Sequence, residues 1–284
     1  MMKVNSECLD SSAIVHTIKE KGVAIVEDFL DPTECGKIRD SLEKILGEFV
    51  QNHLYFGSNI NQVIYNYFLY DPYLMQILEL QLIDEVMKKL IDDDYVLISP
   101  SARNPLVRAE LPEGKKTSGF GWHTDSRVAD KGSAKLYMPS MNFYAALAIE
   151  PFTKENAATK YIPNSHLAYQ KPLDREAALL HETLEVSAGA LIFYDAALWH
   201  RVGLPTKFSR WSIFNMYGPW FMKPYFNFLD NLTEAEIQGL SPLVRKILHG
   251  ESLPPKNQNE RVNTLSGNST GEASLVTFPK SNSI

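Results

Sequence analysis

The sequence has few cysteines and no long apolar run. Its two cysteines, Cys8 and Cys35, lie near the N-terminus and outside any CxxC pair, which argues against a disulfide framework and against cysteine-ligated zinc. The longest apolar runs, YAALAI at 144–149 and GALIFY at 189–194, are too short to cross a bilayer. The polar start also lacks the basic and apolar regions of a signal peptide. We therefore expect a cytoplasmic protein with no membrane partner.

The charge of the chain narrows the class of partner. The 284 residues carry a formal net charge of −6, and lysine and arginine form no cluster. Nucleic-acid backbones attract basic surfaces, so this balance favours a small-molecule substrate and argues against nucleic acid. With 44% hydrophobic and 11% aromatic residues, the chain can bury a large core. The oligomeric state stays open.

The apolar pattern divides the chain into parts of different character. Residues 1–250 are expected to form one domain, with a helical N-terminal part at 9–92, a β-core at about 95–220 and a C-terminal helix at about 232–249. Asp31 as N-cap and Pro32 in the first turn predict a helix that runs to about Phe49. The polar stretch 251–284 is predicted to be a disordered tail.

Shorter runs refine this division. A β-rich run, GVAIVEDFL, occupies 22–30, whereas the apolar periodicity of QVIYNYFL at 62–69 and LMQILELQLIDEVMKKLI at 74–91 predicts further helix. From Tyr95 onward, β-branched and aromatic runs alternate with Gly, Pro, Asn and Asp. Seven of these runs are predicted strands without helices between them, which is typical of a sandwich or jelly roll: VLISP, PLVRAEL, LYMPSMNFYAALAIE, TKYIP, GALIFYD, HRVG and SRWSIFNMYG. The polar connection 126–139 is of the kind that often covers a functional site.

A histidine and an aspartate lie two positions apart in GWHTD at 121–125. In an extended strand the side chains at i and i+2 leave the same face, so His123 and Asp125 can reach a common metal ion. Alone, the pair is a weak signal, because it also occurs in polar turns. His200 is the third candidate, since it follows a predicted buried strand through a tight connection and should lie at the rim of the β-core. The alternative for His200 is a half-buried histidine bonded to a backbone carbonyl.

Arg210 adds a group that can bind an anion. It lies ten positions after His200 and shares one strand face with Ser212. Its planar guanidinium can bond both oxygens of a carboxylate at once. Two histidines and one carboxylate are the facial triad of non-haem iron(II), which leaves positions for a chelating 2-oxo acid and for O2.

Four motifs, in this order and spacing, resemble the phytanoyl-CoA dioxygenase family of iron(II)- and 2-oxoglutarate-dependent oxygenases: HTD at 123–125, ENAATKYIPNSH at 155–166, VSAGALIFYDAALWH at 186–200 and RWS at 210–212. The resemblance extends over nearly all of the chain except its two ends. It implies a mainly β protein with a double-stranded β-helix (jelly roll, cupin-like) core and N-terminal helices packed outside. It also implies that His123, Asp125 and His200 are the iron ligands and that Arg210 holds the 2-oxoglutarate cosubstrate.

The sequence departs from the family pattern at two turns. Ala157 and Asn164 stand where the family usually has glycine, and asparagine tolerates the left-handed conformation that such a glycine often marks. We therefore expect the turn at Asn164 to persist. Position 125 is aspartate, whereas the family's halogenases have alanine or glycine there, so hydroxylation or a related oxidation is favoured over halogenation.

Weaker roles are assigned to several neighbours. By the same resemblance, Thr159 could give a hydroxyl to the cosubstrate carboxylate, although strand packing also explains it, and Ser212 could do the same beside Arg210. Asn142 and Tyr144 share a strand face and could contact the cosubstrate, with core hydrogen bonding as the alternative. His166 is expected to be structural. The candidate substrate-binding residues are Trp122, Arg108, Tyr137 and Trp220.

Taken together, the residues predict a 2-oxoglutarate-dependent non-haem iron dioxygenase. Such an enzyme would hydroxylate or otherwise oxidise a C–H bond of a small organic molecule, with release of succinate and CO2. Two alternatives are a non-catalytic jelly-roll protein that binds a metal or small ligand, and a cupin-type metalloenzyme that uses no 2-oxo acid. The complete triad with Arg210 argues against the first, and the Arg210-Trp211-Ser212 motif argues against the second.

Overall fold

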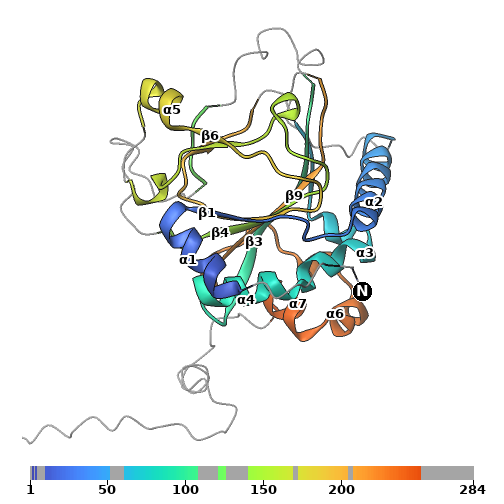
Figure 1. Cartoon of the computed structure of the whole chain (residues 1–284). Coiled ribbons are helices and arrows are strands. Elements are labelled where there is room, and N and C mark those ends of the chain that lie inside the picture. The colour runs from blue at the N-terminus through green and yellow to red at the C-terminus, as the bar shows by residue number, and fades with distance from the viewer. Residues whose placement is uncertain are drawn as a thin grey trace, which may run out of the picture.

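Two antiparallel β-sheets form the core of the protein (Figure 1). The computed structural model describes residues 2, 4, 10–51, 61–107, 121–125, 140–168, 172–203 and 207–250. The predicted tail at 251–284, the connection at 126–139 and the end of the PLVRAEL run lie outside these ranges. Within them, no helix is both long and apolar enough to span a membrane.

The large sheet has six strands in the order β1-β7-β4-β9-β3-β2. Their bounds are β1 (Val23–Val26), β2 (Asn61–Tyr65), β3 (Tyr95–Pro105), β4 (Phe143–Ala148), β7 (Leu191–Asp195) and β9 (Ser212–Pro219). The small sheet has the order β6-β5-β8, with β5 (Lys160–Tyr161), β6 (Glu182–Thr183) and β8 (His200–Arg201). An isolated antiparallel bridge between His123 and His200 extends the small sheet by one residue.

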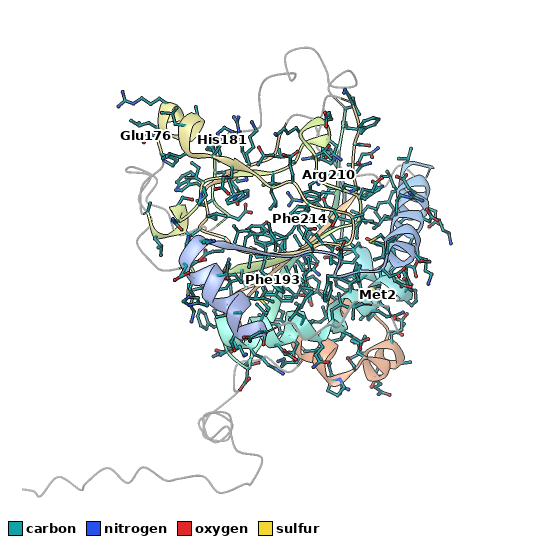
Figure 2. The ribbon with its side chains drawn as sticks, in the orientation of Figure 1. Met2, Glu176, His181, Phe193, Arg210 and Phe214 are labelled. Atoms are coloured by element: carbon teal, nitrogen blue, oxygen red, sulfur yellow. The ribbon has the colours of Figure 1, made fainter. Side chains whose placement is uncertain are left out.

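Strands at the centre of the large sheet are buried on both faces. In β4, Phe143, Ala145 and Leu147 pack into the core on the helical side, whereas Tyr144 and Ala146 line a pocket on the other side. Strand β7 alternates in the same way, because successive side chains of a strand leave opposite faces. Figure 2 accordingly shows Phe193 on the helical side, and Phe214 and Arg210 between the two sheets.

Helices cover the outer face of the large sheet. Their bounds are α1 (Ser11–Lys21), α2 (Pro32–Gln51), α3 (Pro72–Met75), α4 (Gln81–Leu90), α6 (Glu234–Gly239) and α7 (Pro242–Ile247), and α5 (Asp174–Leu180) lies apart from them, beside the small sheet (Figure 1). Single turns of 3-10 helix occur at η1 (Tyr67–Leu69), η2 (Gln76–Glu79), η4 (Lys154–Asn156), η5 (Ser165–Leu167) and η6 (Leu229–Asn231). Apolar residues of α1, α2, α4 and α7 share one core with the large sheet.

Local signals explain where the N-terminal helices begin and end. The side chain of Asp10 accepts from the backbone N–H of Ser12 at 2.8 Å, and Gly22 ends α1 in a left-handed conformation. Asp31 caps α2 by accepting from the N–H of Thr33 at 2.7 Å, and Pro32 is the first helical residue, as predicted.

The structure corrects several expectations. QVIYNYFL is mainly strand β2 and the turn η1, not helix, because this segment pairs with β3 as the edge strand of the large sheet, where Val63 and Ile64 are buried. The β-core is therefore not confined to 95–220, since β1 and β2 also join the large sheet. The predicted strand series contains a helix, α5, between β5 and β6.

The predicted C-terminal helix at 232–249 is two short helices. Leu240 has an extended backbone, Ser241 caps α7 through its hydroxyl, and Pro242 begins it. Proline cannot continue a helix from the preceding turn, which explains the break. The run 74–91 is likewise divided, into the end of α3, η2 and α4, with an extended Leu80 before α4.

Candidate active site

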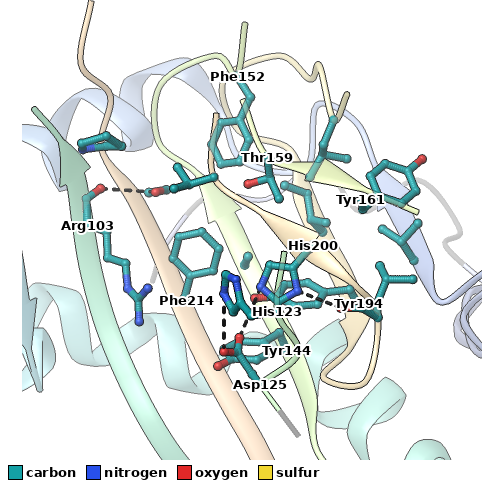
Figure 3. A pocket seen from close by; sticks show the side chains of 18 of the residues that line it. Arg103, His123, Asp125, Tyr144, Phe152, Thr159, Tyr161, Tyr194, His200 and Phe214 are labelled. Carbon is teal, nitrogen blue, oxygen red and sulfur yellow. Dashed lines mark hydrogen bonds and ion pairs between the residues drawn. The ribbon is translucent and has the colours of Figure 1, made fainter. Parts of the chain in front are cut away.

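Three candidate metal ligands meet at one end of the small sheet. The bridge between His123 and His200 has both backbone hydrogen bonds, N–H to carbonyl, at 3.0 Å, and the N–H of Asp125 donates to the carbonyl of Ala196 at 2.8 Å. One ligand atom from each of His123, Asp125 and His200 lies within 4.8 Å of the other two. The Asp125 carboxylate is 4.0 Å from Nε2 of His123 and 3.5 Å from Nε2 of His200 (Figure 3).

Both imidazoles are oriented by backbone carbonyls. Nδ1 of His123 lies 2.9 Å from the carbonyl oxygen of Gly121, and Nδ1 of His200 lies 2.8 Å from that of Leu198. A carbonyl oxygen only accepts, so each Nδ1 carries a hydrogen. This leaves Nε2 of each ring as the nitrogen that, once deprotonated, can give its lone pair to a cation beside Asp125. This arrangement is typical of metal-ligating histidines, and the donor set fits a divalent iron ion.

The electrostatics of the three residues keep the carboxylate charged. Burial by itself raises the pKa of Asp125, but the hydrogen bond and charge of His200, together with the charges of His123 and Arg103, hold the pKa well below its usual range. Burial also lowers the pKa of His123, and the charge of His200 adds to this effect. Asp125 is therefore an anion at neutral pH, which a bound cation requires.

Arg210 is a buried cation with no ion-pair partner among the residues that the structure describes. Its side chain is 2% exposed; Nη1 donates to Oγ of Ser212 and Nη2 to the carbonyl of Ala157, both at 2.9 Å. The guanidinium carbon lies 3.5 Å from the ring centroid of Phe152. Among the described residues, Nε has no hydrogen-bond partner and the guanidinium no ion pair within 4.0 Å. Burial lowers the pKa of Arg210 to about 9, with only the charge of Glu150 opposing it, so an anionic ligand would complete this site.

A cavity of about 240 Å³ between the two sheets joins the triad to Arg210. Of the residues singled out in the sequence, the structure brings these to its walls: His123, Asp125, Tyr144, Thr159, His200, Arg210 and Ser212 (Figure 3). The remaining wall is mostly apolar or aromatic, with Phe152, Ile192 and Phe214 among its members. Such a pocket suits a small organic molecule.

Other candidates lie elsewhere. Asn142 is buried outside the pocket lining, with Nδ2 3.7 Å from Sδ of Met216. Trp122 packs in a separate cluster with Trp199, because it precedes His123 in an extended segment and so points the opposite way. Trp220 lies at the surface after β9, 38% exposed, and is not a lining residue. Arg108 and Tyr137 lie outside the described residues.

The structure also adds residues that the motifs did not reveal. Arg103 of β3, Tyr161 of β5 and Tyr194 of β7 line the same pocket. The alternation of Ser101, Arg103 and Pro105 in β3 is the one sequence signal that could have placed Arg103 on an inner face.

The two unusual turns adopt the backbone that glycine would favour. Ala157 has φ 68° and Asn164 has φ 60°, so the turn expected at Asn164 is present. Nε2 of the nearby His166 lies 3.1 Å from the carbonyl oxygen of Lys19, at the surface and away from the pocket lining.

Comparison with known proteins agrees with this arrangement. The family model for phytanoyl-CoA dioxygenase (PhyH) matches residues 18–204. Two relatives, the uncharacterized proteins Mb1539 of Mycobacterium bovis and Rv1501 of Mycobacterium tuberculosis, are each 26% identical over 223 residues, covering 76% of this chain and 78% of theirs.

Solved structures with the same fold include HygX from Streptomyces hygroscopicus with nickel and 2-oxoglutarate bound, at 16% identity and a TM-score of 0.58 over 75% of this chain and 89% of that one. The α-ketoglutarate-dependent carbocyclase SnoK from nogalamycin biosynthesis is also 16% identical, with a TM-score of 0.56 over 85% and 94%. These likenesses, together with the antiparallel sheets, identify the core as a jelly roll. Because the family model covers well over half of its length, the chain belongs to the phytanoyl-CoA dioxygenase family of iron(II)- and 2-oxoglutarate-dependent enzymes.

Proposed function

We propose that the protein is a dioxygenase that hydroxylates, or otherwise oxidises, a C–H bond of a small organic molecule, with release of succinate and CO2 from 2-oxoglutarate. One observation carries this proposal: the His123, Asp125 and His200 cluster and the buried guanidinium of Arg210, which forms no ion pair within the described part of the chain, line a single pocket. A metal site alone would suit many proteins. A metal site beside a buried cation suits a cosubstrate that chelates iron at one end and ends in a carboxylate at the other.

Each residue has a defined part in this proposal. His123, Asp125 and His200 would hold iron(II), and Arg210 would pair with the far carboxylate of 2-oxoglutarate, with the hydroxyls of Ser212 and Thr159 beside it. When bound, iron and 2-oxoglutarate together supply the oxidising chemistry with O2. The chain supplies ligand geometry, a fixed cosubstrate and apolar walls that limit the access of water.

The wall of the pocket also supports a particular orientation of the cosubstrate. Ser212 is fully buried and connects two strands, because its Oγ accepts from Arg210 and donates to the carbonyl of Arg103 at 3.2 Å. Phe152 covers one face of the Arg210 guanidinium, which favours the approach of a carboxylate at the edge of this cation. In-plane approach is the geometry in which a guanidinium bonds a carboxylate most strongly.

The experiment is an assay of succinate formation from 2-oxoglutarate with iron(II), ascorbate and O2, alone and with fractions of a metabolite extract. The wild type should form succinate, and at least one fraction should increase it and yield an oxidised product by mass spectrometry. His123→Ala, checked for folding by circular dichroism, is the matched control and should form none. Wild-type protein that forms no more succinate than His123→Ala with every fraction would refute the proposal.

A further inference from the structure

Arg103 is a second arginine in the pocket, and neither the metal site nor the cosubstrate anchor uses its side chain. It lies opposite Ser212 in the register of β3 and β9, and its side chain runs into the space beside His123 and Asp125 (Figure 3). Its Nε donates to Oγ of Ser101 at 3.0 Å, and its guanidinium carbon lies 5.6 Å from the ring centroid of Phe214. These two contacts fix the direction of the guanidinium.

The ends of this guanidinium have no partner among the residues that the structure describes. The bond to Ser101 is the one hydrogen bond that its side chain makes there, and no carboxylate of those ranges lies within 4.0 Å of it. Two terminal nitrogens therefore keep donors that can face a ligand.

The described residues of the pocket supply no counter-ion for Arg103 when the metal and cosubstrate are bound. The charged residues on the described wall are Asp125, Arg103 and Arg210, because ligating histidines are neutral. The double positive charge of iron(II) is balanced by the two carboxylates of 2-oxoglutarate, and Asp125 balances one arginine. One positive charge remains in a partly apolar pocket, where an unpaired charge is costly.

We propose that Arg103 binds a carboxylate of the primary substrate, so that the substrates of this protein are small organic acids whose apolar part lies along Phe214 and the triad. This inference rests on the proposed function, since it takes the Arg210 site to be filled by 2-oxoglutarate. The burial of the two arginines fits these different roles. Arg210, the proposed cosubstrate anchor, is 2% exposed, whereas Arg103 is half-buried and can contact a substrate that enters from solvent. The competing source of the carboxylate is the metal-chelating end of 2-oxoglutarate.

The test uses the full chain loaded with nickel(II) and 2-oxoglutarate, without O2. The probes are unbranched monocarboxylates from acetate to octanoate and phenylacetate, each compared with its uncharged primary amide, and binding is followed by ligand-observed NMR. At least one carboxylate should bind the wild type while its amide does not. Arg103→Gln should weaken that binding about ten- to hundred-fold, the range for a charge-assisted pair, with Arg103→Lys between the two. Arg39→Gln, an exposed arginine of α2, is the matched control and should bind as the wild type does.

The other outcomes overturn the inference in distinguishable ways. If the amides bind as well as the acids, or if no acid depends on Arg103, the residue does not select an anionic substrate. If Arg103→Gln loses 2-oxoglutarate while acid binding is kept, the residue serves the cosubstrate. A wild-type chain that binds neither nickel nor 2-oxoglutarate contradicts the proposed function itself, and the inference about Arg103 falls with it.

Discussion

Nη2 of Arg210 donates a hydrogen bond to the carbonyl oxygen of Ala157 at 2.9 Å, and Ala157 itself has a left-handed backbone with φ 68°. Residues with a Cβ rarely adopt this conformation, because the Cβ approaches the following carbonyl. The turn after η4 therefore directs a carbonyl at a buried guanidinium at the expense of local strain. The proposed cosubstrate anchor thus depends on a backbone conformation more than fifty positions away in the sequence.

Replacement of Ala157 by valine should weaken 2-oxoglutarate binding. Ala157 is fully buried, and a β-branched side chain in the left-handed region adds strain on the order of 1–3 kcal/mol, which a shift of the turn and its carbonyl would relieve. Ala157→Gly should keep wild-type affinity, because glycine adopts this conformation freely. Titration calorimetry with nickel(II) present measures the 2-oxoglutarate affinity of both variants. A folded valine variant with unchanged affinity would contradict the role given to this turn.

Replacement of Arg210 by lysine keeps the positive charge and removes the planar fork. The free energy of 2-oxoglutarate binding should weaken by about 1.5–3 kcal/mol, which raises the dissociation constant roughly ten- to hundred-fold. Affinity for nickel(II) alone should stay unchanged, since Arg210 contacts none of the three candidate ligands. Titration calorimetry with nickel(II) present measures this dissociation constant. If it is unchanged in the lysine variant, another residue must anchor the cosubstrate.

Many of the residues that the structure gathers in the pocket can be picked out in the sequence, because they occur in motifs with regular spacing. The i, i+2 pair His123 and Asp125 shares one side of an extended segment, and His200 follows a buried strand. Arg103 was missed because a lone arginine in a strand carries no motif, and its neighbours Ser212 and Phe214 come from a strand more than a hundred positions later. Trp122 lies outside the pocket lining although it is next to His123 in the sequence, because neighbouring residues of an extended segment point to opposite sides.

The sequence predicts the fold class correctly, but it does not predict every helix and strand. QVIYNYFL fits both helical and extended periodicity over so few residues, and only the pairing with β3, a tertiary contact, decides for a strand. The outer helices were easier, because Asp10, Asp31 and Pro32 are local signals that act within one turn. Breaks such as Ser241-Pro242 were present in the sequence, and the C-terminal region was nevertheless predicted as one helix.

Gly189 should be intolerant of alanine. Its φ is +87°, and a Cβ there would lie 2.4 Å from the carbonyl oxygen of Leu30, whose N–H donates to the carbonyl of Gly189 at 2.9 Å. Gly189→Ala should lower the free energy of unfolding by about 2–4 kcal/mol. Gly36→Ala in α2, where no atom lies within 4 Å of the new Cβ, should raise it by about 0.5–1 kcal/mol. Urea denaturation compares the two; equal stabilities would show that the close approach at Gly189 is not needed.

Asp125 should exclude halogenation. Three protein ligands and a chelating cosubstrate would leave the metal a single position, which O2 needs, so chloride has no place to bind. The wild type is therefore expected to give only oxygenated product in high chloride. Asp125→Gly opens a position but also removes the negative charge beside both histidines, and it should lose most turnover with at best a trace of halogenation. Mass spectrometry of products with and without chloride or bromide measures this. A halogenated main product from the wild type would overturn the reaction class.

The central claim is that His123, Asp125 and His200 hold iron(II) together with 2-oxoglutarate. Its most direct measurement is an anaerobic titration with iron(II) and 2-oxoglutarate, followed by visible absorption. The wild type is predicted to develop a weak metal-to-ligand charge-transfer band, and His200→Ala, which removes the ligand on β8, should show neither the band nor wild-type iron affinity. A folded wild type without the band, or a His200→Ala variant that keeps both, would contradict the account.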